Sequence, residues 1–408
     1  MRERYTVRQA LGRMREKSTM KHLLCGVGLG FAVAISGPAA AQDKIKVGVI
    51  VTLSGPSAVL GQQARDGFQL AVKDLGAKLG GKEAEVIVVD DELKPDVAVT
   101  KVRGLLERDK VDFVVGPIFS NVLQAIHKPV VESNAILISP NAGPSVFAGK
   151  GCNPNFFVTS YQNDQVHEIL GKVAQDRGYK RVYLLAPNYQ AGRDSMAGFK
   201  RHFKGEVVEE SYVPLNNLDF QSELAKIASM KPDALFTFMP GGMGVNLVKQ
   251  YRQAGLTDRI PFLSAFTVDE STLPAQQDAA LGLFGGMTWA PNLDNPQNKK
   301  FVAEYEKAYN QVPGSYAFQA YDAALLIDSA VKAAGGTANK DALRQALRKA
   351  DFQSLRGDFK FAANGYPVQD FYLVKAAKRP DGKFQTEIVQ KVFDDYTDVY
   401  AKECAQTN

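Results

Sequence analysis

The residues best suited to chemistry lie in two turns that follow neighbouring predicted strands. Ser120 stands at the expected N-cap position of a helix after the first strand, and Asn141, Ala142 and Gly143 form an open turn after the second. The carboxyl ends of parallel strands meet at one edge of a sheet, and the free N–H groups of a helix N-terminus at that edge attract an anion. We therefore expect the two turns to form a seat for a carboxylate group.

Signatures of bond-making chemistry are missing from the sequence. It contains no P-loop, serine nucleophile elbow, CxxC pair or HExxH zinc motif. The histidines beyond the N-terminal region, His127, His167 and His202, fall on predicted helices without the spacing of metal ligands. Lys and Arg are scattered among acidic residues without interleaved aromatic residues, which argues against nucleic-acid binding. The sequence thus predicts a binding protein rather than an enzyme, with no catalytic residue, metal ion or cofactor.

Residues 1–41 have the pattern of a secretory signal peptide. A basic segment precedes an apolar run at 23–35, and Ala39-Ala40-Ala41 stands before Gln42. The apolar run is too short to remain as a membrane anchor. Seven of the 49 Lys and Arg but only two of the 44 Asp and Glu lie in this leader, so the net charge of +5 belongs to the leader alone. We expect a neutral mature protein in the periplasm, with Met20 as an alternative start of translation.

Two cysteines, Cys152 and Cys404, lie outside the leader. An even pair in an exported chain favours one disulfide, which would pin the C-terminal tail to the body of the protein. Two unpaired thiols are the alternative.

A regular alternation of strand and helix patterns predicts the fold class. The expected strands lie at 45–51, 85–89, 112–115, 135–139, 156–159, 182–186, 207–213, 234–239, 261–264, 359–361 and 371–374. The expected helices lie at 61–75, 97–108, 122–132, 166–177, 194–203, 220–229, 245–253, 298–309, 316–334 and 340–349. Such alternation indicates parallel sheets with right-handed crossovers.

The length of 408 residues, without a low-complexity linker, indicates two domains connected by more than one segment. We expect an α/β protein of two doubly wound parallel-sheet lobes joined by a multi-strand hinge. The expected first lobe comprises 42–159 plus 290–367, and the expected second lobe comprises 160–289 plus 368–408.

Five motifs follow one another along the chain: IKVGVIVTLSGP from Ile45, DFVVGP from Asp112, ILISPNAG from Ile136, QYRQAGL from Gln250 and AYDAALL from Ala320. In this order and spacing they resemble the leucine/isoleucine/valine-binding family of periplasmic solute-binding proteins. The resemblance covers almost all of the chain after the leader. It implies a type I periplasmic binding protein, in which two lobes close by a hinge over a ligand that is then delivered to an ABC-type permease in the inner membrane. It also favours a monomer.

The resemblance assigns roles to both turns of the first lobe. The serine that holds the ligand's carboxylate in this family falls on Ser120, with Phe119 just before it, and the backbone of the second loop falls on Asn141. The family's threonine hydroxyl falls on Gly143, so one side-chain donor is missing. The N–H group of Gly143 is its expected partial replacement.

The second lobe departs from the amino-acid binders of this family. The acidic residue and the tyrosine that contact the ligand's ammonium group fall on Phe266 and Pro240. A buried ammonium without a carboxylate partner is costly by several kcal/mol. The two substitutions therefore argue against an α-amino acid as ligand, unless Asp269 or another acid reaches the site.

Aromatic residues at the expected site favour a ring-bearing acid instead. Phe266 replaces the acidic residue, and Phe119, Tyr189 and Tyr321 are expected nearby. Stacking and edge contacts between rings contribute about 0.5–1.5 kcal/mol beyond the burial of area. The predicted ligand is therefore an aromatic carboxylate of the benzoate or phenylpropenoate type.

Three polar residues, Tyr161, Arg193 and Gln319, are expected to meet ring substituents or a second carboxyl group. The predicted function is that of a transport receptor for an aromatic carboxylate. One alternative is a branched-chain amino acid-binding protein of the same transporter class. Another is a periplasmic sensor that presents its ligand to a membrane receptor kinase.

Overall fold

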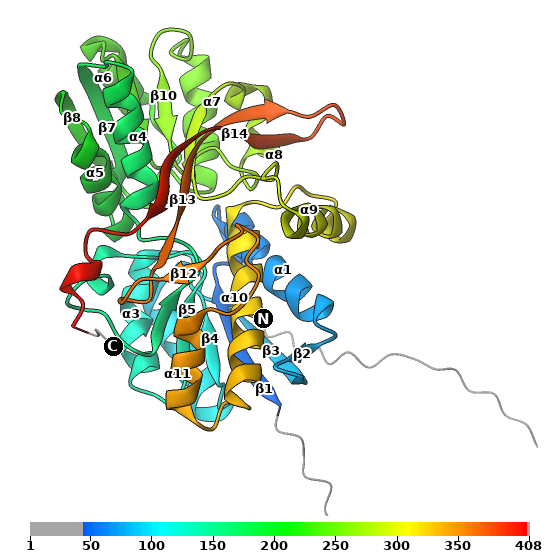
Figure 1. Ribbon diagram of the computed structural model, residues 1–408. Coiled ribbons are helices and arrows are strands. Elements are labelled where there is room, and N and C mark those ends of the chain that lie inside the picture. The colour runs from blue at the N-terminus through cyan, green and yellow to red at the C-terminus, as the bar shows by residue number, and fades with distance from the viewer. Residues whose placement is uncertain (1–43, 406–408) are drawn as a thin grey trace, which may run out of the picture.

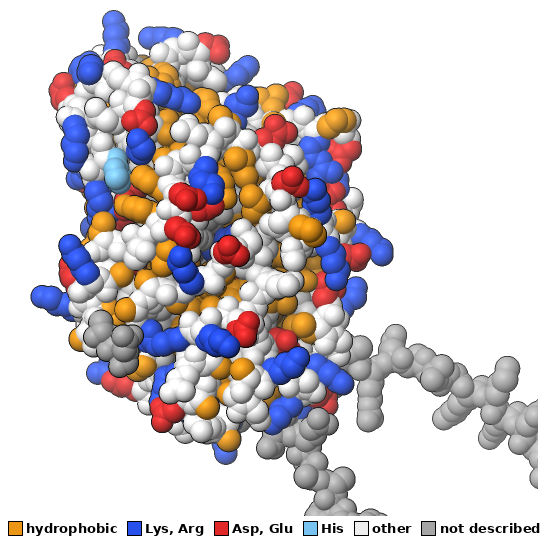
Figure 2. Space-filling model, viewed as in Figure 1, with side chains coloured by type: hydrophobic (Ala, Val, Ile, Leu, Met, Phe, Trp, Pro, Cys, Tyr) orange, Lys and Arg blue, Asp and Glu red, His pale blue; other side chains and the backbone are white. Residues whose placement is uncertain are grey.

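The computed structural model describes residues 44–405, which form two α/β lobes (Figure 1). The predicted signal peptide lies outside the described residues. Within the described part of the chain, no helix has the length and apolar character needed to cross a bilayer. Lys and Arg side chains are interspersed with Asp and Glu over the face shown in Figure 2, as the mixed charge pattern of the sequence indicates.

The first lobe is built on a sheet in the order β2-β3-β1-β4-β5-β6. Its strands are β1 (Ile45–Val51), β2 (Lys78–Leu79), β3 (Lys82–Asp90), β4 (Phe113–Val115), β5 (Ile136–Ser139) and β6 (Phe156–Val158). All neighbours are parallel except β2 and β3, which form a short hairpin. β4 and β5 are buried at every residue, because helices cover both faces of the sheet.

The helices of the first lobe come from two distant parts of the chain. They are α1 (Ala58–Asp74), α2 (Pro95–Arg103), α3 (Ser120–Val131), α9 (Pro296–Tyr309), α10 (Ser315–Ala334) and α11 (Lys340–Lys349). α10 packs beside α1 and α11, and α2 packs beside α3. The first lobe is therefore completed by a segment that follows the second series of strands, as Figure 1 shows.

The second lobe contains a larger, mixed sheet in the order β8-β7-β9-β10-β11-β13-β12, with β14 paired to β13. Its strands are β7 (Arg181–Pro187), β8 (Glu206–Val213), β9 (Ala234–Thr237), β10 (Phe262–Ser264), β11 (Phe284–Met287), β12 (Lys360–Phe361), β13 (Pro367–Lys378) and β14 (Phe384–Tyr396). The helices are α4 (Gln165–Asp176), α5 (Gln190–His202), α6 (Gln221–Met230), α7 (Gly242–Gln253) and α8 (Leu273–Gln276). β7 to β11 are parallel, and β13 runs antiparallel to β11.

β14 is the main element that the sequence did not predict. Its residues, FQTEIVQKVFDDY, are half-buried or exposed except for buried Thr386, and they form no apolar run. The strand is stabilised by its long antiparallel pairing with β13 and by a turn at 379–383. Figure 1 shows the two strands as a ribbon that extends from the junction of the lobes into the second lobe.

Several segments connect the lobes, which confirms the predicted two-lobed α/β fold. The chain enters the second lobe after β6, returns to the first after β11, and re-enters the second in β13. Buried Arg356 holds these segments together: its guanidinium donates to the carbonyl oxygens of Thr159 (2.8 Å) and Ser160 (3.1 Å) and to Gln369 Oε1. It also pairs with Asp322 at 3.2 Å, so the buried charge is compensated.

The predicted disulfide between Cys152 and Cys404 is confirmed, with a Cα–Cα distance of 5.7 Å. It joins the C-terminal tail to the loop before β6. The tail also bonds within the junction, where Asn364 Nδ2 donates to Ala148 O (2.7 Å) and to Asp398 Oδ2 (3.0 Å). The tail therefore ties the two lobes on one side of the hinge.

Replacement of both cysteines, Cys152→Ser with Cys404→Ser, is expected to lower the free energy of unfolding by about 2–4 kcal/mol, because the bond closes a loop of 252 residues. Urea unfolding of the oxidised wild type and the double variant measures this difference. Reductant should destabilise the wild type to the same extent and leave the variant unchanged. Equal midpoints for oxidised and reduced wild type would contradict the prediction.

Candidate ligand-binding site

The N-terminus of α3 lies at the junction of the lobes, at the end of β4. Phe119, not Ser120, occupies the N-cap position, and no side chain caps the helix. The expectation that Ser120 is the cap was therefore wrong: Ser120 is the first helical residue, because Phe119 is still extended at φ −104° and ψ 137°. The first N–H groups of a helix lack a partner within it and attract an anion; in α3 these are the N–H groups of Ser120 and Asn121, because that of Val122 donates to Phe119 O (3.1 Å).

Asn163 connects the two turns to the second lobe. Its side-chain nitrogen donates to Ser120 Oγ (3.1 Å) and to Asp194 Oδ2 (2.9 Å), and its side-chain oxygen accepts from the N–H of Gly143 (3.0 Å). The N–H of Gly143 is thus engaged within the protein, contrary to the role expected for it. A Cβ atom at Gly143 would lie 1.9 Å from Tyr161 O, which explains why no larger residue fits there.

Asn141 fixes the second turn against the first. Its side-chain nitrogen donates to Ile118 O (2.7 Å), and its side-chain oxygen accepts from the Tyr161 hydroxyl (3.2 Å). Ala142 is buried, and its carbonyl accepts from Ser139 Oγ (2.6 Å). The two predicted turns therefore lie side by side.

Six buried rings gather next to this seat, and we call them the aromatic group. They are Phe119, Tyr161, Tyr189, Phe238, Phe266 and Tyr316. Their ring centroids are 5.0 Å apart for Tyr161 and Phe266, 5.8 Å for Phe266 and Tyr316, 6.2 Å for Phe119 and Tyr189, and 6.3 Å for Tyr189 and Phe238. Both lobes contribute to the group, since Phe119 is the N-cap of α3 and Tyr316 belongs to α10, whereas Tyr189, Phe238 and Phe266 follow second-lobe strands.

Phe238 and Tyr316 were missed by the sequence analysis. Both lie at the junction of the lobes. Phe238 directly follows the last residue of β9, and Tyr316 is the second residue of α10. Position at the carboxyl end of a strand was the signal available for Phe238. For Tyr316 the sequence offered none, because its place depends on the return of the chain to the first lobe.

Polar atoms without partners accompany these rings. Among residues 44–405, both amide atoms of buried Gln319 lack a hydrogen-bond partner. One carboxylate oxygen of Asp269, Oδ2, is likewise enclosed without a partner. Burial raises the pKa of the Tyr316 hydroxyl well above its usual value, and the charge of Asp269 raises it further. This phenol is therefore a neutral hydrogen-bond donor.

The lobes touch beside Pro240, so the structure is closed over the site. Pro240 is buried in the turn before α7, and the N–H of Gly242 donates to Pro56 O of the first lobe (3.0 Å). A Cβ atom at Gly242 would lie 2.8 Å from Pro56 Cβ. Glycine at this position permits the close approach of the two backbones.

Two predicted site residues lie apart from the aromatic group. Arg193 is exposed, and its guanidinium donates to Asn188 Oδ1 (2.8 Å). The Tyr321 hydroxyl donates to Asp74 Oδ2 (2.9 Å), and its ring packs on Phe301. Because successive helical residues rotate by about 100°, Tyr321 points away from Tyr316, and Arg193 points away from its buried neighbour Asp194.

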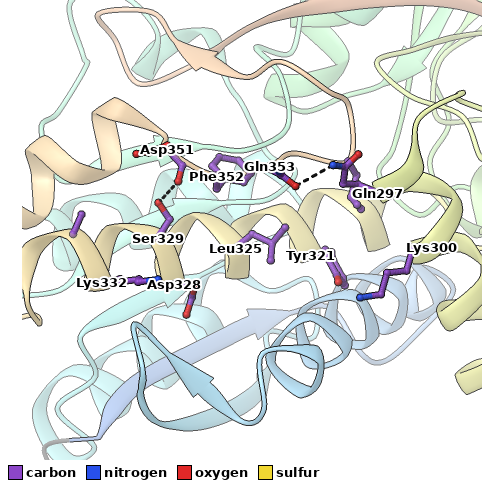
Figure 3. Close-up of a pocket in the computed structure, with 12 residues that line it drawn as sticks. Gln297, Lys300, Tyr321, Leu325, Asp328, Ser329, Lys332, Asp351, Phe352 and Gln353 are labelled. Carbon is purple, nitrogen blue, oxygen red and sulfur yellow. Dashed lines mark hydrogen bonds between the residues drawn. The ribbon is translucent and has the colours of Figure 1, made fainter.

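Tyr321 instead lines a groove of about 600 Å³ on the first lobe, along α10. Figure 3 shows Lys300 beside Tyr321 and Lys332 beside Asp328, with Gln297 and Gln353 joined by a hydrogen bond of 2.9 Å at one edge. The groove shares no residue with the aromatic group.

Comparisons with known sequences and structures all find periplasmic solute-binding proteins. The periplasmic binding protein family matches residues 44–383. The chain is 29% identical to a Leu/Ile/Val-binding protein homolog of Brucella melitensis, over 88% of this chain and 94% of that protein. It resembles an ABC transporter solute-binding protein of R. palustris in complex with benzoate (34% identity, TM-score 0.83, 88% of this chain and 99% of that one). A similar protein from Rhodopseudomonas palustris BisB5, in complex with 3,4-dihydroxybenzoic acid, has 33% identity and a TM-score of 0.82, over 87% and 99%.

Asp194 of α5 contacts the first lobe, and we therefore expect it to hold the lobes together. Its carboxylate accepts from the N–H (3.1 Å) and hydroxyl (2.7 Å) of first-lobe Ser145, as well as from Asn163. Asp194→Ala should destabilise the closed form by about 2–4 kcal/mol, since these donors lose a charged acceptor. Small-angle X-ray scattering should then give a larger radius of gyration than for the wild type.

The matched control is Arg193→Ala, which removes the exposed neighbour on the same helix turn. It should leave the scattering curve unchanged. Identical curves for Asp194→Ala and the wild type would show that Asp194 does not govern closure.

Proposed function

Because this chain belongs to the periplasmic binding protein family and has the fold of an ABC transporter solute-binding protein, we propose that it binds an aromatic carboxylate between its two lobes. The observation that carries the proposal is the aromatic group beside the uncapped N-terminus of α3. The relatives from R. palustris, which were solved with benzoate and 3,4-dihydroxybenzoic acid, support it.

In the proposed complex, the ligand's carboxylate accepts hydrogen bonds from the first N–H groups of α3 and from the Ser120 hydroxyl. The helix dipole favours a negative charge at this end. The ring lies against the aromatic group, where Phe119 comes from the first lobe and Phe266 from the second. A ligand that contacts both lobes binds the closed form better than the open form, and this differential affinity drives closure.

We propose a periplasmic location after removal of residues 1–41 and delivery of the ligand to an ABC-type permease of the inner membrane. The family consists of solute receptors, which favours this role over catalysis. We also propose that the protein is a monomer and that its lobes comprise 42–159 plus 290–367 and 160–289 plus 368–408. A sensor that presents the ligand to a membrane receptor would use the same closed form.

A thermal-shift screen of residues 42–408, unfolded and refolded to strip bound ligand, tests the ligand class. Benzoate and cinnamate should raise the melting temperature, whereas leucine and valine should not. At a ligand concentration of 100 times Kd, mass action stabilises the native state by about 2.7 kcal/mol. Ser120→Ala should weaken benzoate binding by roughly 10- to 100-fold, the value of one hydrogen bond to a carboxylate.

Ser133→Ala, just beyond the other end of α3, is the matched control and should bind like the wild type. If leucine or valine alone stabilises the protein, the proposed ligand class is wrong, whereas the proposed receptor role still holds.

The branched-chain amino acid alternative has its own test. Restoring an acid at the position of Phe266, by Phe266→Glu, should weaken benzoate binding, because a charge replaces a ring that contacts Tyr161 and Tyr316. The same change should improve leucine binding, because the ammonium group gains a partner. Isothermal titration of both ligands measures the two effects. Tight leucine binding by the wild type, without binding of benzoate, would favour the alternative.

A further inference from the structure

Asp269 is a buried acid with one unused oxygen. It lies in the loop between β10 and α8, and every residue from 262 to 273 in this part of the chain is buried. Its Oδ1 accepts from the N–H (2.8 Å) and the hydroxyl of Ser271 and from the N–H of Thr272 (3.3 Å). Its Oδ2 is enclosed and accepts no hydrogen bond within the described residues.

The loop does not need this second oxygen. Oδ1 alone completes the turn that leads into α8, in the manner of a short side chain that caps a helix. A buried acceptor without a donor destabilises the folded state, and a charged one does so more strongly. A donor supplied by the ligand would satisfy this oxygen.

The position of Asp269 connects it to the aromatic group. Phe266, three residues earlier in the same loop, stacks on Tyr161 and contacts Tyr316. The carboxylate of Asp269 is near enough to both phenols to raise their pKa values, after the larger effect of burial. Gln319 lies three residues after Tyr316 on α10, and neither of its amide atoms has a partner.

The polar groups around the rings therefore differ between the lobes. On the first-lobe side, the N-terminus of α3 and Ser120 suit the ligand's carboxylate. On the second-lobe side, Asp269 offers an acceptor, which repels a second carboxylate and suits a donor. A phenolic hydroxyl is such a donor, whereas an unsubstituted ring has none.

We propose, building on the proposed function, that Asp269 accepts a hydrogen bond from a hydroxyl group on the ligand's ring and so selects hydroxylated aromatic acids over unsubstituted ones. Gln319 provides a second contact to the ring substituent. Asp269 is thereby a specificity-determining residue, although the residue that takes the position of the family's acid is Phe266.

Isothermal titration of the refolded protein with four ligands tests this assignment. The ligands are benzoate, 3-hydroxybenzoate, 4-hydroxybenzoate and 4-methoxybenzoate, the last of which has the ring oxygen but no proton to donate. The wild type should bind at least one hydroxybenzoate roughly 10- to 100-fold more tightly than benzoate, as expected for a hydrogen bond to a charged acceptor. It should bind 4-methoxybenzoate no better than benzoate.

Asp269→Asn is the diagnostic variant. Asn retains Oδ1 for Ser271 and Thr272, so the loop should fold as before, but it replaces Oδ2 by an amide nitrogen that cannot accept. The variant should lose the preference for the hydroxybenzoate and bind benzoate with nearly unchanged affinity. Glu270→Gln is the matched control: this neighbouring buried acid already accepts from the N–H (2.7 Å) and hydroxyl (2.6 Å) of Thr386, so its replacement should leave the preference intact.

The possible failures are distinguishable. Equal affinity of the wild type for benzoate and both hydroxybenzoates overturns the role of Asp269 and leaves the proposed function in place. An Asp269→Asn variant that retains the preference, or that weakens all four ligands equally, also overturns it. Binding of none of the four by the wild type overturns the proposed function as well. The comparison with 4-methoxybenzoate needs no variant, so the inference stays testable if Asp269→Asn does not fold.

Discussion

The hydrogen bonds of Asn163 are the constraint on which the site depends. One side chain joins the start of α3 through Ser120, the second turn through Gly143, and the second lobe through Asp194. Because an amide has both donors and an acceptor, it satisfies all three partners at once. The two turns and α5 are thus fixed relative to one another by one side chain, so we expect the geometry of the proposed carboxylate seat to be coupled to the closure of the protein.

The hinge itself is stiffened by buried charge. Arg356 is held by Asp322 and by carbonyl oxygens of the segment after β6, and loss of either ionic partner would leave an uncompensated charge in the interior. The segment that carries Tyr161 and Asn163 begins at these carbonyls. We therefore expect any motion between the lobes to pivot about Arg356, close to Tyr161 and Asn163.

The sequence predicted most of the framework, because apolar runs and helical spacing are local. β1 was predicted residue for residue, and the helix at 340–349 was predicted without error. Local patterns failed where strand pairing or backbone geometry decides the structure: β14 depends on its pairing with the preceding strand β13, and Phe119 rather than Ser120 is the N-cap of α3. The disulfide was predictable from the number of cysteines and the export signal, whereas the directions of Arg193 and Tyr321 were not.

The charge state of Asp269 depends on its burial, which its place in the sequence does not reveal. Burial raises its pKa to about 6 from 3.8 in the unfolded chain, so the folded state binds the proton more tightly. The free energy of unfolding therefore falls as the pH rises from near 4 to near 6, and the loss of stability persists at neutral pH. A ligand that donates to the ionised carboxylate recovers part of this loss on binding, whereas a bare ring recovers none. The energetic cost of burying the Asp269 carboxylate without a donor thus favours ligands that bear one.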